Sequence, residues 1–334
     1  MSICYFKKFV NNGYMDKLMK TILNKLKHWI EAKRCLGGIK RKEIMEILKC
    51  TTKRGLELKG AIFNTLPSDI VLIMIPGICS NLFQNELLYE TGRLLEENGI
   101  NCIIAHTHDS FSCFAYTDFS TGKQRISGTF DDEFNMVYDD VESYVEFAKR
   151  AGYKHIILAG HSLGSNKIIH YLGNTSDDFV DYFIVSSPVD IMHWWNNMPN
   201  IDKCFNLAQK WVKEGRGDDI VPFLFGGFSP MKAKTVLGFF NADNLKNCPV
   251  ISGEGETKTL YNMKPNGVFI IGSKDSVTGE SPKGFMEQIN LWTVHPEYNR
   301  VMEIKGASHI FYNMHKEYAR AVLDCIQSRF MTVV

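Results

Sequence analysis

The sequence predicts an α/β protein built around a doubly wound, mostly parallel β-sheet. Several short runs are apolar throughout, which is typical of parallel strands covered by helices on both faces. These runs comprise residues 71–75, 102–105, 156–159, 182–185 and 268–271, and residues 301–304 are a further expected strand, which contains Glu303. Helical stretches separate them, and strands that alternate with helices in this way are joined by right-handed crossovers. A single domain with a large buried core follows from this pattern.

The remaining elements follow from periodicity and from turn residues. Residues 46–53 and 56–63 are expected to form an antiparallel hairpin around Arg54-Gly55 at the start of the sheet. Apolar residues at three- and four-residue steps predict helices over 84–98, 131–150, 163–172 and 313–330. Residues 188–265 contain no clear strand, and so long a connection is rare between two strands of an α/β sheet. We therefore expect a lid to be inserted between about 188 and 266.

The predicted lid is rich in aromatic side chains, Trp194 and Trp195 among them. An apolar cover over a bound substrate would need such residues. A small hydrophobic core inside the insertion would need them too. We assign Trp194 and Trp195 to substrate binding, with the internal core as the alternative.

A basic segment precedes the main body, which is expected to span residues 43–334. Residues 1–42 hold eleven Lys and Arg against two acidic residues, Asp16 and Glu31. Apolar positions recur with helical spacing from 14 to 31. Three interpretations of this amphipathic segment stay open. Residues 14–33 lie on an anionic membrane surface, or bind a protein partner such as a second copy in a homodimer, or dock on the main body.

The bulk composition narrows the classes of function. The formal net charge is +1, so no nucleic-acid partner is expected. The nine cysteines are scattered, without a C-x-x-C pair, which favours a reducing setting over a disulfide framework. We find no signal peptide and no stretch of about 18 uncharged apolar residues, and expect a soluble cytoplasmic protein.

The pentapeptide Gly160-His161-Ser162-Leu163-Gly164 matches the pattern G-x-S-x-G. It follows an apolar run and opens a helical stretch, which is the strand–turn–helix setting of a nucleophile elbow. Such a turn lifts the serine hydroxyl above the sheet edge, and side chains at positions 160 and 164 would collide with the neighbouring strand and helix. We therefore predict that Ser162 is a nucleophile rather than a solvent-facing serine.

A serine hydroxyl needs a base, and in this setting its partners follow in the order Ser, Asp or Glu, His. Asp275 follows the run 268–271 and His309 follows the run 301–304. Both fall at the carboxyl edge of the sheet, where open α/β sheets bind ligands. We predict a catalytic triad of Ser162, Asp275 and His309. The residues that compete for these roles are less well placed: Asp190, Asp243, His295 and His315.

Two backbone N–H groups are expected to form an oxyanion hole. One belongs to Leu163, and the other to Ile78 in the loop after the run 71–75. Gly77 lets the chain turn the Ile78 amide inward. We assign Gly77 and His161 to substrate binding. An ordinary Pro-Gly turn at the end of a strand is the alternative for Pro76-Gly77.

Two further features are expected to supply neither a metal ligand nor a nucleophile. His106-Thr107-His108-Asp109 lacks the additional ligands that zinc requires, so we predict no metal and no cofactor. These histidines and the long loop 106–129, with Arg125, are instead candidates for the wall of a substrate cleft. Cys79 lies outside any nucleophile elbow and is expected to be a packed thiol.

Over residues 43–334 the sequence resembles the α/β-hydrolase superfamily, through residues 160–164, residues 76–78 and the loops of Asp275 and His309. Members with a serine nucleophile are mostly esterases, lipases, thioesterases, peptidases and amidases, with occasional acyltransferases. Residues 152–172 resemble a poorly characterised branch that includes fungal siderophore-ester hydrolases. Many relatives carry His-Gly where this chain has Pro76-Gly77, which leaves the oxyanion geometry open.

The triad and the resemblance together imply a serine hydrolase of the carboxylesterase, thioesterase or amidase type. Its substrate would be a small to medium organic or peptide-like ester, thioester or amide, cleaved through an acyl-enzyme. An acyltransferase with the same triad, or a slow hydrolase-fold binding protein, are the alternatives.

Overall fold

The computed structural model describes residues 45–64, 67–176, 178–227, 229–239, 258–279 and 281–331. The chain divides between Glu43 and Ile44, and the described residues all belong to the second unit. The helix predicted at 14–31, its expected contacts through 14–33 and the competing residue Asp243 lie outside the described residues. None of the described helices is both long and apolar enough to cross a membrane.

The described main sheet has eight strands in the order β1-β2-β4-β3-β7-β8-β11-β12. Their bounds are β1 Glu46–Thr51, β2 Glu57–Phe63, β3 Ile70–Ile75, β4 Asn101–Ile104, β7 His155–His161, β8 Tyr182–Ser186, β11 Asn266–Lys274 and β12 Arg300–Ser308. β1 pairs with β2, and β2 with β4, in antiparallel fashion. All pairs from β4 to β12 are parallel. The predicted doubly wound, mostly parallel sheet is confirmed.

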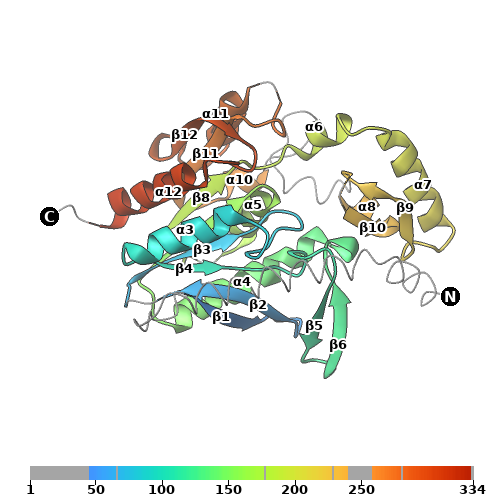
Figure 1. Ribbon diagram of the computed structural model, residues 1–334, viewed down its shortest axis with the longest axis horizontal. Helices are drawn as coiled ribbons and strands as arrows, with labels where there is room; N and C mark the ends of the chain where they lie inside the picture. The colour runs from blue at the N-terminus through green and yellow to red at the C-terminus, as the bar shows by residue number, and fades with distance from the viewer. Residues whose placement is uncertain are drawn as a thin grey trace, which may run out of the picture. The chain divides into compact units, whose positions relative to one another are not determined.

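Helices cover both faces of this sheet (Figure 1). On one face lie α3 and α12, which share an apolar cluster with that face of the sheet. The other face is covered by α4, α5, α10 and α11, around a second cluster. The helix bounds are α3 Glu86–Glu97, α12 His315–Phe330, α4 Val137–Arg150, α5 Leu163–Asn174, α10 Lys258–Tyr261 and α11 Pro282–Leu291. Because both faces are covered, β3 is buried along its whole length.

Two sequence expectations about the segment between β4 and β7 were wrong. The helix expected from 131 begins only at Val137, after two 3-10 turns at Thr129–Asp131 and Phe134–Met136. Between these turns, Asp132 is drawn inward to His108, 2.8 Å from its Nε2 atom. The expected loop 106–129 contains a hairpin of β5 (Phe114–Asp118) and β6 (Lys123–Ser127). Helix α11 was not predicted from the sequence.

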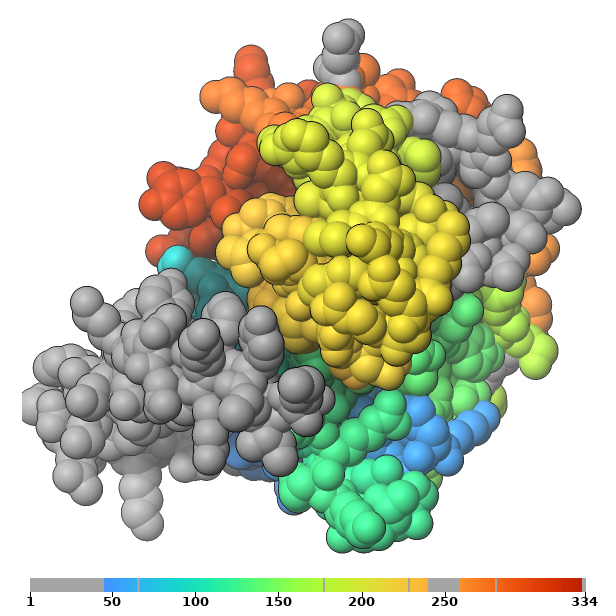
Figure 2. All heavy atoms as spheres, turned by 90° about the vertical axis from the view of Figure 1, so that its right-hand side faces the viewer, coloured from blue at the N-terminus to red at the C-terminus, as the bar shows by residue number. Residues whose placement is uncertain are grey.

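Residues 188–265 form an insertion between β8 and β11. No strand was expected there, and two are present among its described residues. Its described elements are α6 Ile191–Asn196, α7 Ile201–Lys213, β9 Ile220–Phe225, β10 Ser229–Lys232, α8 Ala233–Gly238 and α10. β9 and β10 pair as an antiparallel hairpin. Figure 2 faces the insertion, which stands out there in yellow. Its apolar core includes Leu163, so the insertion packs directly against the start of α5.

Candidate active site

Ser162 lies in a sharp turn between β7 and α5. Its backbone has φ 55° and ψ −131°, which is an uncommon conformation for a residue with a side chain. The turn is possible because of the flanking glycines. A Cβ atom on Gly160 would lie 2.4 Å from the Gly164 oxygen, and one on Gly164 would lie 2.1 Å from the Ile75 oxygen. The strand–turn–helix geometry expected from the sequence is therefore present.

The structure brings His309 and Asp275 to this serine. His309 Nε2 lies 2.9 Å from Ser162 Oγ, and His309 Nδ1 lies 2.9 Å from Asp275 Oδ2. Asp275 follows the end of β11 and is 3% exposed. Its second oxygen accepts a hydrogen bond from the Val277 amide at 2.9 Å. Three residues that lie far apart in the sequence thus form one hydrogen-bonded series.

The electrostatics suit a carboxylate that stabilises an imidazolium. Burial by itself would raise the pKa of Asp275, but the hydrogen bond and charge of His309 and the Val277 amide outweigh it. The pKa of Asp275 therefore lies below its ordinary value, and the group is ionised at neutral pH. An ionised carboxylate on Nδ1 leaves Nε2 free to accept a proton from the serine hydroxyl.

The loop after β3 passes directly against the serine. A Cβ atom on Gly77 would lie 2.9 Å from Ser162 Cβ and 3.3 Å from Ser162 Oγ, so only glycine allows this approach. Among the described residues, neither the Ile78 amide nor the Leu163 amide has a hydrogen-bond partner. Both residues adjoin the contact between Gly77 and Ser162, and two unpaired donors beside a nucleophile can stabilise an oxyanion.

His161 differs from the sequence expectation of a substrate contact. Its side chain is 2% exposed and packs near Phe311, with ring centroids 5.8 Å apart. Its Nε2–H donates to the backbone oxygen of His309 at 2.8 Å. His161 directly precedes the serine in the elbow, and its ring contacts the segment that carries His309 and Phe311. His161 therefore holds the His309 loop in place.

Trp194 and Trp195 lie on α6, half-buried, in the core of the insertion. Trp194 meets Phe225 edge to face at a centroid distance of 5.4 Å, and Trp195 meets Phe205 at 5.6 Å. These contacts favour the alternative of an internal core for both residues. Asp190, a competitor for the acidic role, instead caps α6 by accepting a hydrogen bond from the His193 amide.

The two histidines after β4 do not line a cleft or act as a pair. His106 is buried between the Lys59 oxygen and the Leu82 amide. His108 faces the other way, with Nδ1 2.6 Å from Asp140 and Nε2 2.8 Å from Asp132. Ligand atoms of His108, Asp109 and Asp132 lie within 4.8 Å of one another. Protein partners already hold His108 and Asp109, so the grouping is an ion-pair network.

This buried network was not anticipated from the sequence. Besides His108 it contains Lys167, which is 1% exposed and pairs with Asp109. One signal was present in the sequence. Lys167 is the only Lys, Arg, Asp or Glu in residues 163–174, the mostly buried helix that follows the nucleophile elbow, and a buried charge requires a partner.

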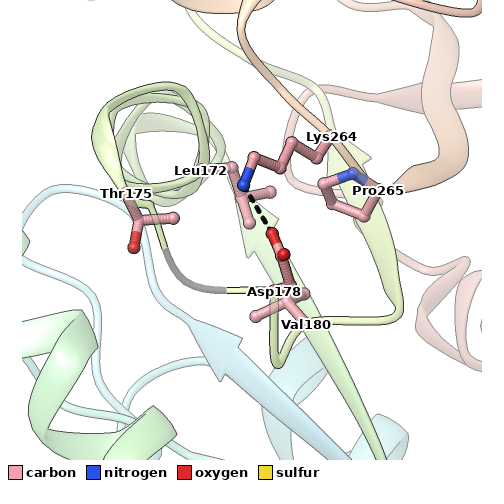
Figure 3. Close-up of a pocket in the computed structure, with 6 residues that line it drawn as sticks. All are labelled: Leu172, Thr175, Asp178, Val180, Lys264 and Pro265. Atoms are coloured by element: carbon pink, nitrogen blue, oxygen red, sulfur yellow. Dashed lines mark hydrogen bonds and ion pairs between the residues drawn. The ribbon is translucent and has the colours of Figure 1, made fainter.

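A surface pocket of about 320 Å³ lies near the end of α5 opposite to Ser162 (Figure 3). Lys264 and Asp178 form an exposed ion pair across it, with Nζ and Oδ1 2.5 Å apart. The helix between this pocket and the serine is about 18 Å long. The pocket is therefore separate from the candidate active site.

Two buried histidines should make the fold sensitive to acid. Burial lowers the pKa of His106 and of His161 to about 4, from an ordinary 6.5. Between these values the unfolded chain binds protons that the folded chain does not. The stability that each histidine contributes is therefore present above pH 6.5 and lost as the pH falls towards 4. Between these two pKa values, each histidine changes the free energy of unfolding by about 1.4 kcal/mol per pH unit.

Urea unfolding measured from pH 4.5 to 7 checks this expectation. The variant His161→Gln keeps a donor for the His309 oxygen but cannot titrate, so its free energy of unfolding should depend less steeply on pH than that of the wild type. If the free energy of unfolding depends on pH equally steeply in the two proteins, the lowered pKa of His161 is wrong.

The sheet order, the elbow and the helices on both faces define an α/β-hydrolase fold. The chain belongs to the family described as protein of unknown function, DUF1749, which matches residues 63–236. No curated protein matches the sequence.

Several solved structures share the fold. Est1E from Butyrivibrio proteoclasticus with bound ferulic acid is 13% identical, with a TM-score of 0.56 over 84% of this chain and 98% of that one. The α/β hydrolase GrgF from Penicillium sp. sh18 is 14% identical, with a TM-score of 0.63 over 85% and 98%. The Pyrococcus furiosus esterase Pf2001 is 17% identical, with a TM-score of 0.53 over 88% and 94%.

Proposed function

We propose that this protein is a serine hydrolase that cleaves an ester, thioester or amide through an acyl-enzyme on Ser162. The observation that carries the proposal is the double contact of His309, which lies 2.9 Å from Ser162 Oγ and 2.9 Å from Asp275 Oδ2. An imidazole fixed in this way can take the proton of the serine hydroxyl and later return it.

Each step then has a residue to perform it. Ser162 Oγ attacks the carbonyl carbon while His309 Nε2 takes its proton, and ionised Asp275 stabilises the imidazolium. The amides of Ile78 and Leu163 donate to the oxygen that becomes negative. The leaving group takes the proton from Nε2. Water then attacks the acyl-enzyme while His309 takes a proton from it. The bond between Ser162 Oγ and the acyl carbon breaks, His309 returns the proton to Ser162 Oγ, and the free acid departs.

The insertion supports an apolar substrate group. Its core reaches Leu163, directly beside the serine, so the same aromatic-rich segment borders the place where an acyl group would lie. We infer that residues 188–265 act as a lid over that group. Because Est1E has been solved with ferulic acid bound, aromatic acyl groups belong among the first substrates to be tried.

Hydrolysis of activated esters by the purified protein tests the proposal. The panel comprises p-nitrophenyl esters of short, medium and long acyl chains and one hydroxycinnamate ester. We expect release of the free acid, with a burst of about one nitrophenolate per protein wherever deacylation is slow. Addition of an alcohol or amine acceptor separates the reaction types, since an acyltransferase forms the acylated acceptor in place of the acid. Failure to cleave any member of the panel would contradict the proposal and favour a binding protein.

A further inference from the structure

A buried ion pair lies one helical turn beyond the nucleophile elbow. Lys167, on α5, is 1% exposed, and its Nζ atom lies 2.6 Å from each carboxylate oxygen of Asp109 and 3.0 Å from Thr107 Oγ1. Asp109 is fully buried. Burying two charges costs free energy that their attraction does not fully return, so such a pair is weak evidence for a role in stability. Its position suggests a different role.

On one side, the pair is joined to Leu163 through the helix α5. Lys167 follows Leu163 by four residues on α5, so the two side chains lie on the same face of the helix. Leu163 is the first residue of α5, and its amide is one of the two proposed oxyanion donors. Asp109 therefore anchors the end of the helix that carries this donor.

On the other side, hydrogen bonds lead from Asp109 to the second donor. The backbone oxygen of Asp109 accepts from Thr129 Oγ1 at 2.7 Å, and Thr129 Oγ1 accepts from the thiol of Cys79 at 3.0 Å. Cys79 directly follows Ile78 and has φ 52°, a conformation that a residue with a side chain keeps only when its surroundings hold it. The thiol also lies 3.6 Å from Ser229 Oγ of β10.

Contacts with α4 hold the loop that carries Asp109. Its neighbour His108 contacts Asp140 of α4 through both its ring and its backbone amide. Arg54 in turn pairs with Asp140. Asp109 is thus connected to both proposed oxyanion donors, on one side through α5 and on the other through Thr129 and Cys79.

We propose that Asp109 and Lys167 are positioning residues for the oxyanion hole: their ion pair fixes the Leu163 amide and, through Thr129 and Cys79, the Ile78 amide relative to each other. This inference rests on the proposed hydrolase function. Donors that act on a developing charge must be held within about 0.5 Å of the productive geometry, and a displacement of about 1 Å costs roughly 100-fold in rate. Such a displacement affects the transition state more than substrate binding.

The test uses the full chain with three variants. Asp109→Asn with Lys167→Met removes both charges together, so neither is left buried without a partner. Thr129→Val breaks the connection to Cys79 and leaves the ion pair intact. Leu95→Ala, a core variant in the last turn of α3, controls for lost stability. Each protein is measured for kcat, KM, melting temperature and inhibition by a boronic acid that mimics the tetrahedral intermediate.

We expect kcat to fall about 100-fold in the double variant and about tenfold in Thr129→Val, with KM unchanged. The affinity for the boronic acid should fall in parallel with kcat. Leu95→Ala should keep the wild-type kcat despite a lower melting temperature. Wild-type kcat in the double variant, or a loss of kcat in Leu95→Ala that matches it, would overturn the inference. A wild-type protein that cleaves no ester would instead overturn the proposed function.

Discussion

Replacing Ser162 by alanine should reduce kcat for an activated ester by about 10⁴- to 10⁶-fold, because it removes the hydroxyl on which the proposed acyl-enzyme forms. The fold should tolerate the change. Alanine retains the Cβ atom of serine, so the backbone at φ 55° meets the same steric conditions. The side-chain hydrogen bond that is lost leads to His309 Nε2.

Initial rates with a p-nitrophenyl ester and a thermal unfolding curve measure both expectations. Ser328→Ala is the matched control, since its hydroxyl donates to the Cys325 oxygen near the end of α12 and its loss should leave kcat unchanged. Wild-type turnover in Ser162→Ala would exclude this serine as the nucleophile.

Replacing Gly77 by alanine should reduce kcat by about 10²- to 10³-fold with a smaller effect on KM, as expected when an oxyanion donor is displaced. The added Cβ would lie 2.9 Å from Ser162 Cβ and 3.2 Å from the His161 oxygen. Neither of these atoms belongs to the far end of a flexible side chain. The loop must therefore move, and the Ile78 amide moves with it.

Gly99→Ala separates this steric effect from general destabilisation. Gly99 has φ +75°, and a Cβ atom added there would enter open space, so alanine costs about 1–2 kcal/mol of backbone strain without touching the site. Its stability should fall while kcat stays at the wild-type value. If Gly77→Ala and Gly99→Ala lose kcat equally, the oxyanion role of this loop is wrong.

The fold was predictable because its signals are local. A strand buried on both faces, such as β3, must be apolar at every position. The elbow is recognisable in the sequence by two glycines that no other residue could replace. The elements that were missed lack such signals. The β6 strand Lys123–Ser127 is mostly exposed and polar, so only its pairing with β5 identifies it as a strand.

Some residues of the candidate site could be predicted from the order of the strands, and others depend on packing. Asp275 and His309 could be predicted because the sheet topology brings the ends of β11 and β12 to one edge. The orientation of His161 could not, since it depends on which side of the elbow is filled by Phe311 and the His309 loop. The pairing of Lys167 with Asp109 also depends on three-dimensional packing, as the two residues lie 58 positions apart.

Reaction of the purified protein with a fluorophosphonate, followed by peptide mass spectrometry, tests the central claim most directly. Such a reagent modifies only a serine that a neighbouring base has activated. The account predicts stoichiometric labelling at Ser162 that is lost in His309→Ala. Labelling at another residue, or at Ser162 without any dependence on His309, would contradict it.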